Sequence, residues 1–79
     1  MEIKKTIKAF LSQRIGTEIE FNDADDIFKL GLVNSFFALE LVNFLENKFS
    51  IQIENDDLSL PNFNSLLNIE QFIKRKTQN

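Results

Sequence analysis

The sequence predicts an all-α fold, a small four-helix bundle with three main helices and one short helix, forming a single domain over residues 1–79. Two glycines and one proline are too few for the many tight turns of a β-sandwich. Apolar residues instead recur every three or four positions in three separate stretches, which is the spacing of a buried helix face. Because the chain has no cysteine and no histidine, disulfides and the usual zinc sites are excluded, and the fold must rest on packing alone.

The first helix is expected over residues 2–15, and Gly16 stands where a left-handed C-terminal cap is expected. The apolar stripe of this helix consists of Ile3, Ile7, Phe10, Leu11 and Ile15. Residues 17–33 lack a sustained period, so we expect a long loop anchored on the core. The apolar side chains that could anchor it are Ile19, Phe21, Ile27, Phe28 and Leu30.

The second helix is expected over residues 35–49, with Asn34 as a strong N-cap. At 100° per residue, an arc of about 100° forms its predicted core face. The residues on that face are Ala38, Leu41, Val42, Leu45 and Phe49. The opposite face, predicted to be exposed, holds Phe36, Glu40, Asn43 and Asn47, with Phe44 beside them and Phe37 near the boundary. Exposed phenylalanines are costly for solubility unless something covers them, and packing against the preceding loop is an alternative role for Phe37.

A connector, a very short helix and a last main helix complete the fold. Residues 50–54 alternate like a strand, but five residues without a sheet partner favour an extended connector. Residues 55–58 predict a very short helix that ends before Pro61. Asn64 or Ser65 can cap a last helix that runs to about residue 76. Its buried stripe consists of Leu66, Ile69, Phe72 and Ile73.

The charge is unevenly distributed along the chain. Residues 18–57 hold ten acidic and two basic residues, whereas both flanking segments are basic and the net charge is −3. This acidic centre argues against a nucleic-acid partner and favours docking onto basic patches of proteins, although an acidic surface kept for solubility is the alternative. No stretch approaches the roughly 18 apolar residues of a membrane span, and no secretory segment begins the chain. We therefore expect a cytoplasmic monomer with no membrane partner.

Ser35 is the residue most suited to carry chemistry. As the first residue after the Asn34 cap it should point outward at a helix start, and the apolar approach to it pivots on Gly31. An exposed serine without a neighbouring base is a poor nucleophile, so it is better suited to receive a group from another enzyme. The chain has no phosphate loop, catalytic triad or metal-ligand set, and we expect no enzyme activity.

The acidic run at residues 22–26 invites a calcium-loop interpretation, which fails on spacing. Counted from Asp23, the position that requires Gly is Phe28, and the position that requires a bidentate Glu is Asn34. We expect a solvated turn that adds to the negative field near Ser35.

The serine segment resembles the acyl carrier protein family, and the resemblance extends over nearly the whole chain. The family shows an apolar loop with a Gly before the serine, Glu-Leu-Val about five residues after it, a later Phe, an Ile-x-Ile connector and an acidic short helix. The matching residues are Gly31, Ser35, Glu40-Leu41-Val42, Leu45-Glu46, Phe49, Ile51, Ile53 and Asp56-Asp57. The resemblance implies that Ser35 bears 4′-phosphopantetheine, transferred from coenzyme A, whose thiol carries acyl groups as thioesters.

The resemblance also implies the partners. These are a phosphopantetheinyl transferase (holo-synthase) and the acyl-loading, modifying and condensing enzymes that dock through basic patches. The residues expected to contact them are Asn34, Phe36, Phe37, Glu40, Asn43, Phe44 and Glu46. Three of these depart from the family pattern: Asn34 replaces the usual Asp, Phe36 replaces Leu, and Phe37 stands where fatty-acid carriers commonly have a polar residue.

The cargo class stays open at this point. Residues 31–42 and 57–63 look like free-standing carriers of polyketide and nonribosomal-peptide pathways, in particular those that build methoxymalonyl or aminomalonyl extender units. Fatty-acid-type carriers and aminoacyl or peptidyl carriers share the fold and the serine. A different alternative is a small helical adaptor that binds a partner through Phe36, Phe37 and Phe44 and has no prosthetic group.

Overall fold

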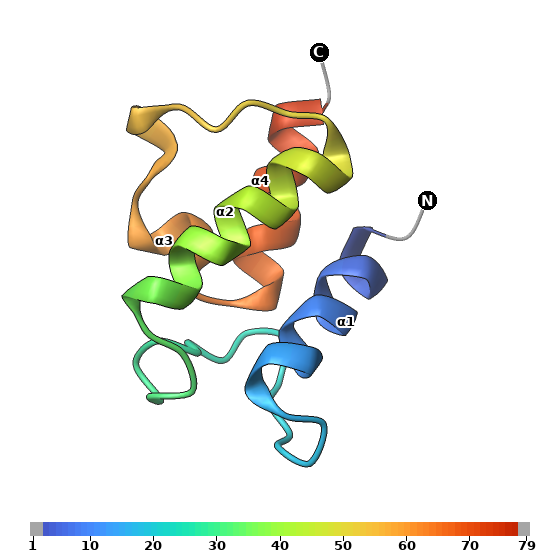
Figure 1. The fold of residues 1–79 in the computed structure, drawn as a ribbon, viewed down its shortest axis with the longest axis vertical. Coiled ribbons are helices and arrows are strands. Elements are labelled where there is room, and N and C mark those ends of the chain that lie inside the picture. The colour runs from blue at the N-terminus through green and yellow to red at the C-terminus, as the bar shows by residue number, and fades with distance from the viewer. Residues whose placement is uncertain (1–2, 78–79) are drawn as a thin grey trace.

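The computed structural model describes residues 3–77, so residue 2 of the predicted first helix lies outside the described residues (Figure 1). Its elements in order are α1 (Ile3–Ile15), α2 (Ser35–Phe49), a 3-10 turn (Asn55–Asp57), α3 (Leu60–Phe63) and α4 (Leu66–Thr77). No strand forms in the described part of the chain. The predicted all-α fold of three main helices and one short helix is therefore confirmed.

The core lies where α1, α2 and α4 face one another. Its buried apolar residues are Ile7, Phe10, Leu11, Ile27, Phe37, Leu41, Leu45, Phe63, Leu66, Ile69, Phe72 and Ile73. Both α1 and α3 pack closely on α4. α1 and α2 meet through aromatic rings instead, since Phe10 stacks on Phe44 with ring centroids 4.1 Å apart. The predicted stripe of α4 is confirmed, and in α1 Ile3 and Ile15 are only half-buried.

The structure corrects the two faces predicted for α2. Leu41 and Leu45 are buried as expected, but Ala38, Val42 and Phe49 are only half-buried. Phe37, expected to contact partners, is 6% exposed. Its ring centroid lies 5.9 Å from that of Phe10 and 6.5 Å from that of Phe28. Phe37 and Phe44 both contact Phe10, so aromatic side chains of α2 bridge to α1.

The loop over residues 17–33 is anchored on the core, as predicted, and it is also hydrogen-bonded to the segment that begins α4. The Ile27 N–H donates to the Asn64 carbonyl at 2.8 Å, and the Leu67 N–H donates to the Asp23 carbonyl at 2.9 Å. Ile27 is fully buried between these contacts. Of the other expected anchors, Phe21 and Phe28 are half-buried, whereas Ile19 and Leu30 are exposed.

One acid of this loop has a structural role that the sequence interpretation missed. Asp26 Oδ1 accepts the N–H groups of Phe28 and Lys29, at 3.1 and 2.9 Å, and Asp26 Oδ2 accepts a hydrogen bond from the Asn64 side chain at 3.1 Å. The carboxylate therefore closes the turn before α2. It is not simply a solvated charge.

The region around Pro61 differs from the prediction. The connector over residues 50–54 is extended as expected, but the expected helix at 55–58 is the 3-10 turn. Pro61 does not mark a stop, because it lies in the first turn of α3. Proline is tolerated there since the N–H that it lacks would have no partner within the helix. None of the helices within residues 3–77 has the length and apolar character needed to cross a membrane.

Candidate functional site

Ser35 is the first residue of α2 and is exposed, as predicted. Asn34 caps the helix: its backbone is extended, and its Oδ1 accepts the N–H of Phe37 at 3.1 Å. The remaining free N–H groups of the first turn and the helix dipole favour negative charge at this end of α2. A phosphodiester on the Ser35 oxygen would lie where that favourable interaction is strongest.

The chain reaches Ser35 through a tight turn at Gly31. Its N–H donates to the Phe28 carbonyl at 3.1 Å, and the next N–H, of Leu32, donates to the Ile27 carbonyl at 3.0 Å. Gly31 has φ +78°, a conformation that L side chains rarely adopt, and nothing lies within 4 Å of the position of an added Cβ. Glycine is therefore required here by backbone conformation and not by lack of space.

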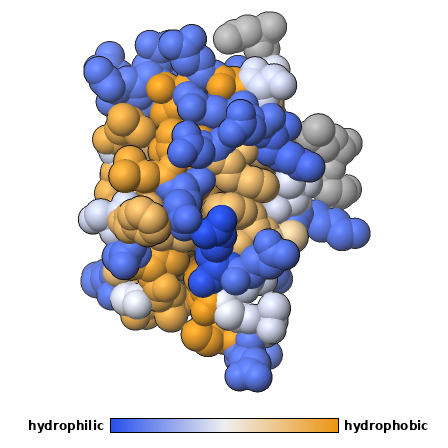
Figure 2. Space-filling view, viewed as in Figure 1, coloured by the Kyte–Doolittle hydropathy of each residue, from blue (hydrophilic) through white to orange (hydrophobic). Residues whose placement is uncertain are grey.

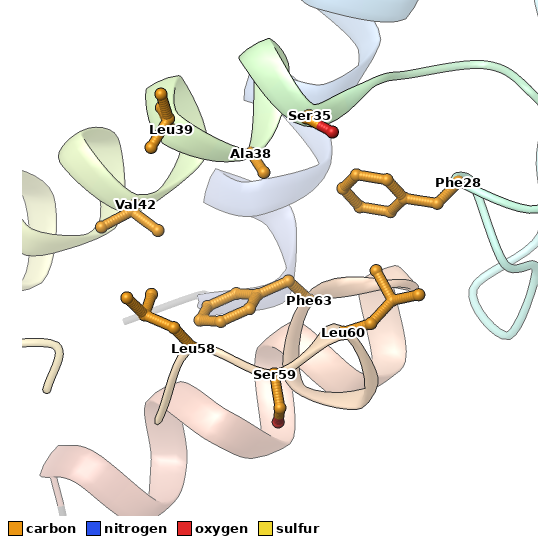
Figure 3. Close-up of a pocket in the computed structure, with 9 residues that line it drawn as sticks. All are labelled: Phe28, Ser35, Ala38, Leu39, Val42, Leu58, Ser59, Leu60 and Phe63. Carbon is orange, nitrogen blue, oxygen red and sulfur yellow. The ribbon is translucent and has the colours of Figure 1, made fainter. Parts of the chain in front are cut away.

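An apolar groove of about 450 Å³ begins at Ser35 and runs between α2 and α3 (Figure 3). Its lining residues are Phe28, Ser35, Ala38, Leu39, Val42, Leu58, Ser59, Leu60 and Phe63. Figure 2 shows that hydrophobic side chains gather over the α2 and α3 side of this face of the molecule. Ser35 therefore has an apolar surface beside it that is open to solvent.

The sequence interpretation missed three exposed leucines of this groove. Leu39 is 67% exposed, and Leu58 and Leu60 are each about half exposed. Leu39 could have been found, because a residue four positions after Ser35 lies on the same helix face. Leu58 and Leu60 carried no such signal, because the path of the chain after the connector is set by tertiary contacts.

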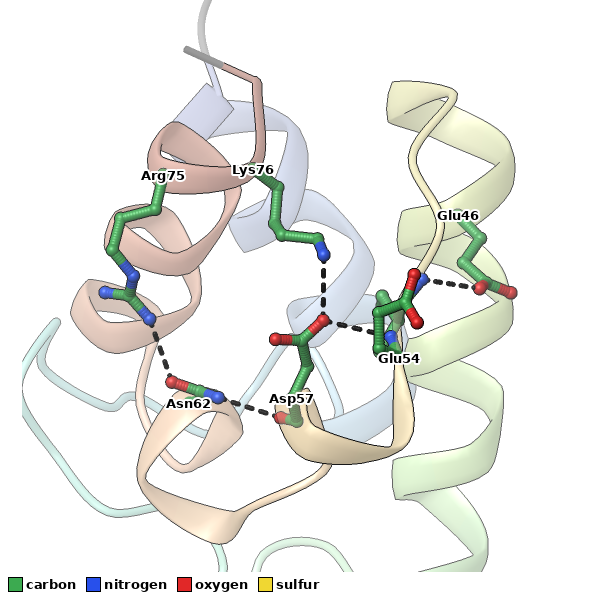
Figure 4. Close-up of polar contacts among 7 residues, drawn as sticks. Glu46, Glu54, Asp57, Asn62, Arg75 and Lys76 are labelled. Carbon is green, nitrogen blue, oxygen red and sulfur yellow. Dashed lines mark hydrogen bonds and ion pairs between the residues drawn. The ribbon is translucent and has the colours of Figure 1, made fainter. Parts of the chain in front are cut away.

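A polar network holds the outer wall of the groove (Figure 4). Asp57 Oδ2 accepts the Lys76 ammonium at 2.8 Å and the Glu54 N–H at 2.9 Å, and the Asp57 carbonyl accepts from the Asn62 side chain at 2.8 Å. The hydrogen bond from Lys76, followed by that from the Glu54 N–H, lowers the pKa of Asp57 below its ordinary value of 3.8. The wall that carries Leu58 is thereby tied to α4.

Two acids predicted to face partners are engaged within the protein. Glu46 Oε2 accepts the Ile53 N–H at 2.9 Å, which fixes the connector to α2 (Figure 4). Glu40 Oε1 accepts a hydrogen bond from Arg14 Nη1 at 2.7 Å. Neither carboxylate is the unengaged surface charge that the sequence suggested.

The other predicted contact residues divide into exposed and interior ones. Phe36 is 69% exposed and Asn43 is also exposed. Phe44 is half-buried because its ring lies against that of Phe10. No group of acidic residues within residues 3–77 is arranged to hold a metal ion.

Comparison with known proteins agrees with this geometry. The family described as "Phosphopantetheine attachment site" matches residues 5–69. The D-alanyl carrier protein of Leuconostoc mesenteroides subsp. mesenteroides is 36% identical over 67 residues, which cover 78% of this chain and 86% of that protein. The D-alanyl carrier protein of Leuconostoc citreum is 34% identical with the same coverage. No solved structure gives a significant match.

Members of the matched family work with a phosphopantetheinyl transferase and with partner enzymes, and are themselves carriers that lack catalytic activity. An exposed serine at a capped helix start and an open apolar surface beside it both fit this chemistry. The family match and the two carrier relatives imply the covalent cofactor 4′-phosphopantetheine. The chain therefore belongs to the acyl carrier family of phosphopantetheine-bearing proteins.

Proposed function

We propose that Ser35 is the attachment residue and that the thiol of its prosthetic group carries an acyl group as a thioester between partner enzymes. The observation that carries this proposal is the position of Ser35 as the exposed first residue of a capped helix. Its oxygen forms a bond to the phosphorus of coenzyme A, 3′,5′-ADP leaves, and the hydroxyl proton passes to the transferase. The N–H groups of the first turn of α2 then stabilise the negative charge of the phosphodiester.

The cargo that we propose is an aminoacyl group, with D-alanyl as the first candidate. Support comes from the two relatives, both named D-alanyl carrier proteins. This favours the aminoacyl alternative over the polyketide, fatty-acid and extender-unit carriers that the motif around Ser35 suggested. An alanyl group is small and cationic, so it does not need the apolar groove.

A second candidate is a larger, apolar or extender-type acyl group of polyketide or fatty-acid synthesis. The observation in its favour is the apolar groove of about 450 Å³ that begins at Ser35. An acyl chain held there would gain about 25 cal/mol per Å² of apolar surface removed from water. The adaptor alternative, which has no prosthetic group, gains no support from the family match.

Loading with each cargo in parallel reactions distinguishes the two cargo classes. The protein is first converted to its phosphopantetheine form and then offered D-alanine, ATP and an amino-acid-activating enzyme of its native host. In parallel it is offered malonyl-coenzyme A and an acyltransferase of that host. We expect a mass increase of one alanyl group that hydroxylamine removes, and no increase with Ser35→Ala. Loading by the acyltransferase alone would favour the second candidate, and loading of Ser35→Ala would refute the attachment site.

We also propose that partners dock around the N-terminal half of α2. Phe36, Leu39 and Asn43 are the exposed side chains that support this surface, and Asn34 lies at its edge. Phe37, Phe44 and Glu46 are not part of it, because their side chains are packed or hydrogen-bonded within the protein.

A further inference from the structure

Beside the docking surface, an ion pair between Arg14 and Glu40 links α1 to α2. Arg14 lies in the last turn of α1 and Glu40 in the second turn of α2. Their side chains are 44% and 33% exposed, and among the described residues one hydrogen bond of 2.7 Å joins them. Because an arginine side chain has five N–H donors and a carboxylate has two acceptor oxygens, both partners can form further contacts.

Arg14 is held in place by more than its contact with Glu40. The centre of its guanidinium lies 5.2 Å from the centroid of the Phe10 ring, a cation–π distance. That ring is itself fixed by its stack on Phe44. Arg14 also lies at the negative end of the α1 dipole, where a cation is favoured. The free protein therefore presents a pre-positioned arginine to Glu40.

The pair lies beside the attachment serine. Arg14, Asn34, Phe36 and Glu40 line a hollow of about 240 Å³, together with Leu32, Val33 and Phe37. This hollow shares no lining residue with the apolar groove, so the two flank the start of α2 on different sides. An enzyme that covers Phe36 while reaching Ser35 must meet the guanidinium.

We propose that Arg14 is a specificity-determining residue for docking. By holding Glu40 in an internal ion pair, it weakens the attraction of this carrier for partners whose docking patch is purely basic. It favours partners that pair a basic group with an acidic one, because the acid can accept the displaced guanidinium. The proposal rests on the proposed function, since it concerns enzymes that act on Ser35.

The exchange is feasible because exposed ion pairs are weak. A basic side chain of a partner competes with Arg14 for Glu40, and this exchange breaks the solvent-exposed contact between Arg14 and Glu40. The free energy needed to break the Arg14–Glu40 pair weakens partner binding. Salt reduces this effect, because it screens both the internal pair and the contact with the partner.

The test compares Arg14→Gln with Lys8→Gln. Both changes remove one positive charge from an exposed position of α1. Lys8 forms no ion pair within residues 3–77 and lies six residues, or about 9 Å along the helix axis, before Arg14. The readout is kcat/KM for phosphopantetheine transfer by a transferase with a basic docking patch, at low and high salt, with the melting temperature measured for each protein.

At low salt we expect Arg14→Gln to raise kcat/KM about two- to fivefold more than Lys8→Gln does, chiefly through a lower KM, as the strength of an exposed ion pair implies. The difference should shrink at high salt. In a Glu40→Gln background Arg14→Gln should give no such gain, and Arg14→Lys alone should give an intermediate one. Equal effects of the two charge removals, or a gain that persists without Glu40, would overturn the proposal. Absence of modification in every protein would instead refute the proposed function, and this inference with it.

Discussion

Truncating each of two adjacent phenylalanines tests the placement of α2. Phe37 is 6% exposed and Phe36 is 69% exposed. A buried Phe→Ala change costs about 3–5 kcal/mol, whereas the whole stability of a domain of this length is about 4–12 kcal/mol at about 0.05–0.15 kcal/mol per residue. At about 4–8 °C per kcal/mol, Phe37→Ala should lower the melting temperature by about 12–40 °C or prevent folding. Phe36→Ala should stay within about 0.5 kcal/mol of the parent protein.

The assay is thermal unfolding followed by circular dichroism, combined with transfer kinetics on the same variants. Burying a phenylalanine at an interface is worth about 1.5–3 kcal/mol before association costs. Phe36→Ala should therefore reduce kcat/KM for partner enzymes about tenfold or more while the protein stays folded. If Phe36→Ala lowers the melting temperature as much as Phe37→Ala does, the helix is rotated relative to this description and the docking surface is misassigned.

Three further changes have defined outcomes. Asn34→Ala removes the cap of α2 and should lower the free energy of unfolding by about 0.5–2 kcal/mol in a denaturant titration; an unchanged value would show that the cap is unimportant. Gly31→Ala should destabilise by about 1–2 kcal/mol in the same titration, because φ is +78° although the space is open. The lowered pKa of Asp57 means that its ionised form contributes stability above the unfolded-state pKa, and that this contribution is lost as pH falls through the lowered folded-state pKa. Asp57→Asn should thus lower the melting temperature at neutral pH and approach the parent protein in strong acid; a constant gap at all pH values would contradict the role of Lys76.

Local signals in the sequence predicted the start of α2 correctly. The Asn34 cap depends on a side chain three residues from the N–H that it accepts, so a short segment contains all the information needed. The same holds for Ser65, one of the two predicted cap residues, whose hydroxyl accepts the Asn68 N–H at the start of α4. Gly31 and Gly16 both have positive φ, in agreement with their expected turn and cap positions.

Tertiary contacts decided what the sequence could not show. The helical period placed Phe37 at the boundary between faces, and the rings of Phe10 and Phe28 made it part of the core. Glu40 is spaced as a surface acid, but its partner Arg14 lies 26 residues earlier in the chain. The rule for proline in a helix interior predicted a stop at Pro61. That prediction is wrong because Pro61 lies in the first turn of α3, where the rule does not apply.

The central claim, that Ser35 bears the prosthetic group, is tested most directly by locating the modification. The protein is incubated with coenzyme A and a phosphopantetheinyl transferase, its intact mass is measured, and the modified residue is identified by fragmentation of its peptides. Ser59 lines the apolar groove that begins at Ser35, so Ser59→Ala supplies the matched control. We predict one added group, lost in Ser35→Ala and retained in Ser59→Ala. A group found on any other serine, or none on a protein that is shown to be folded, would contradict the account.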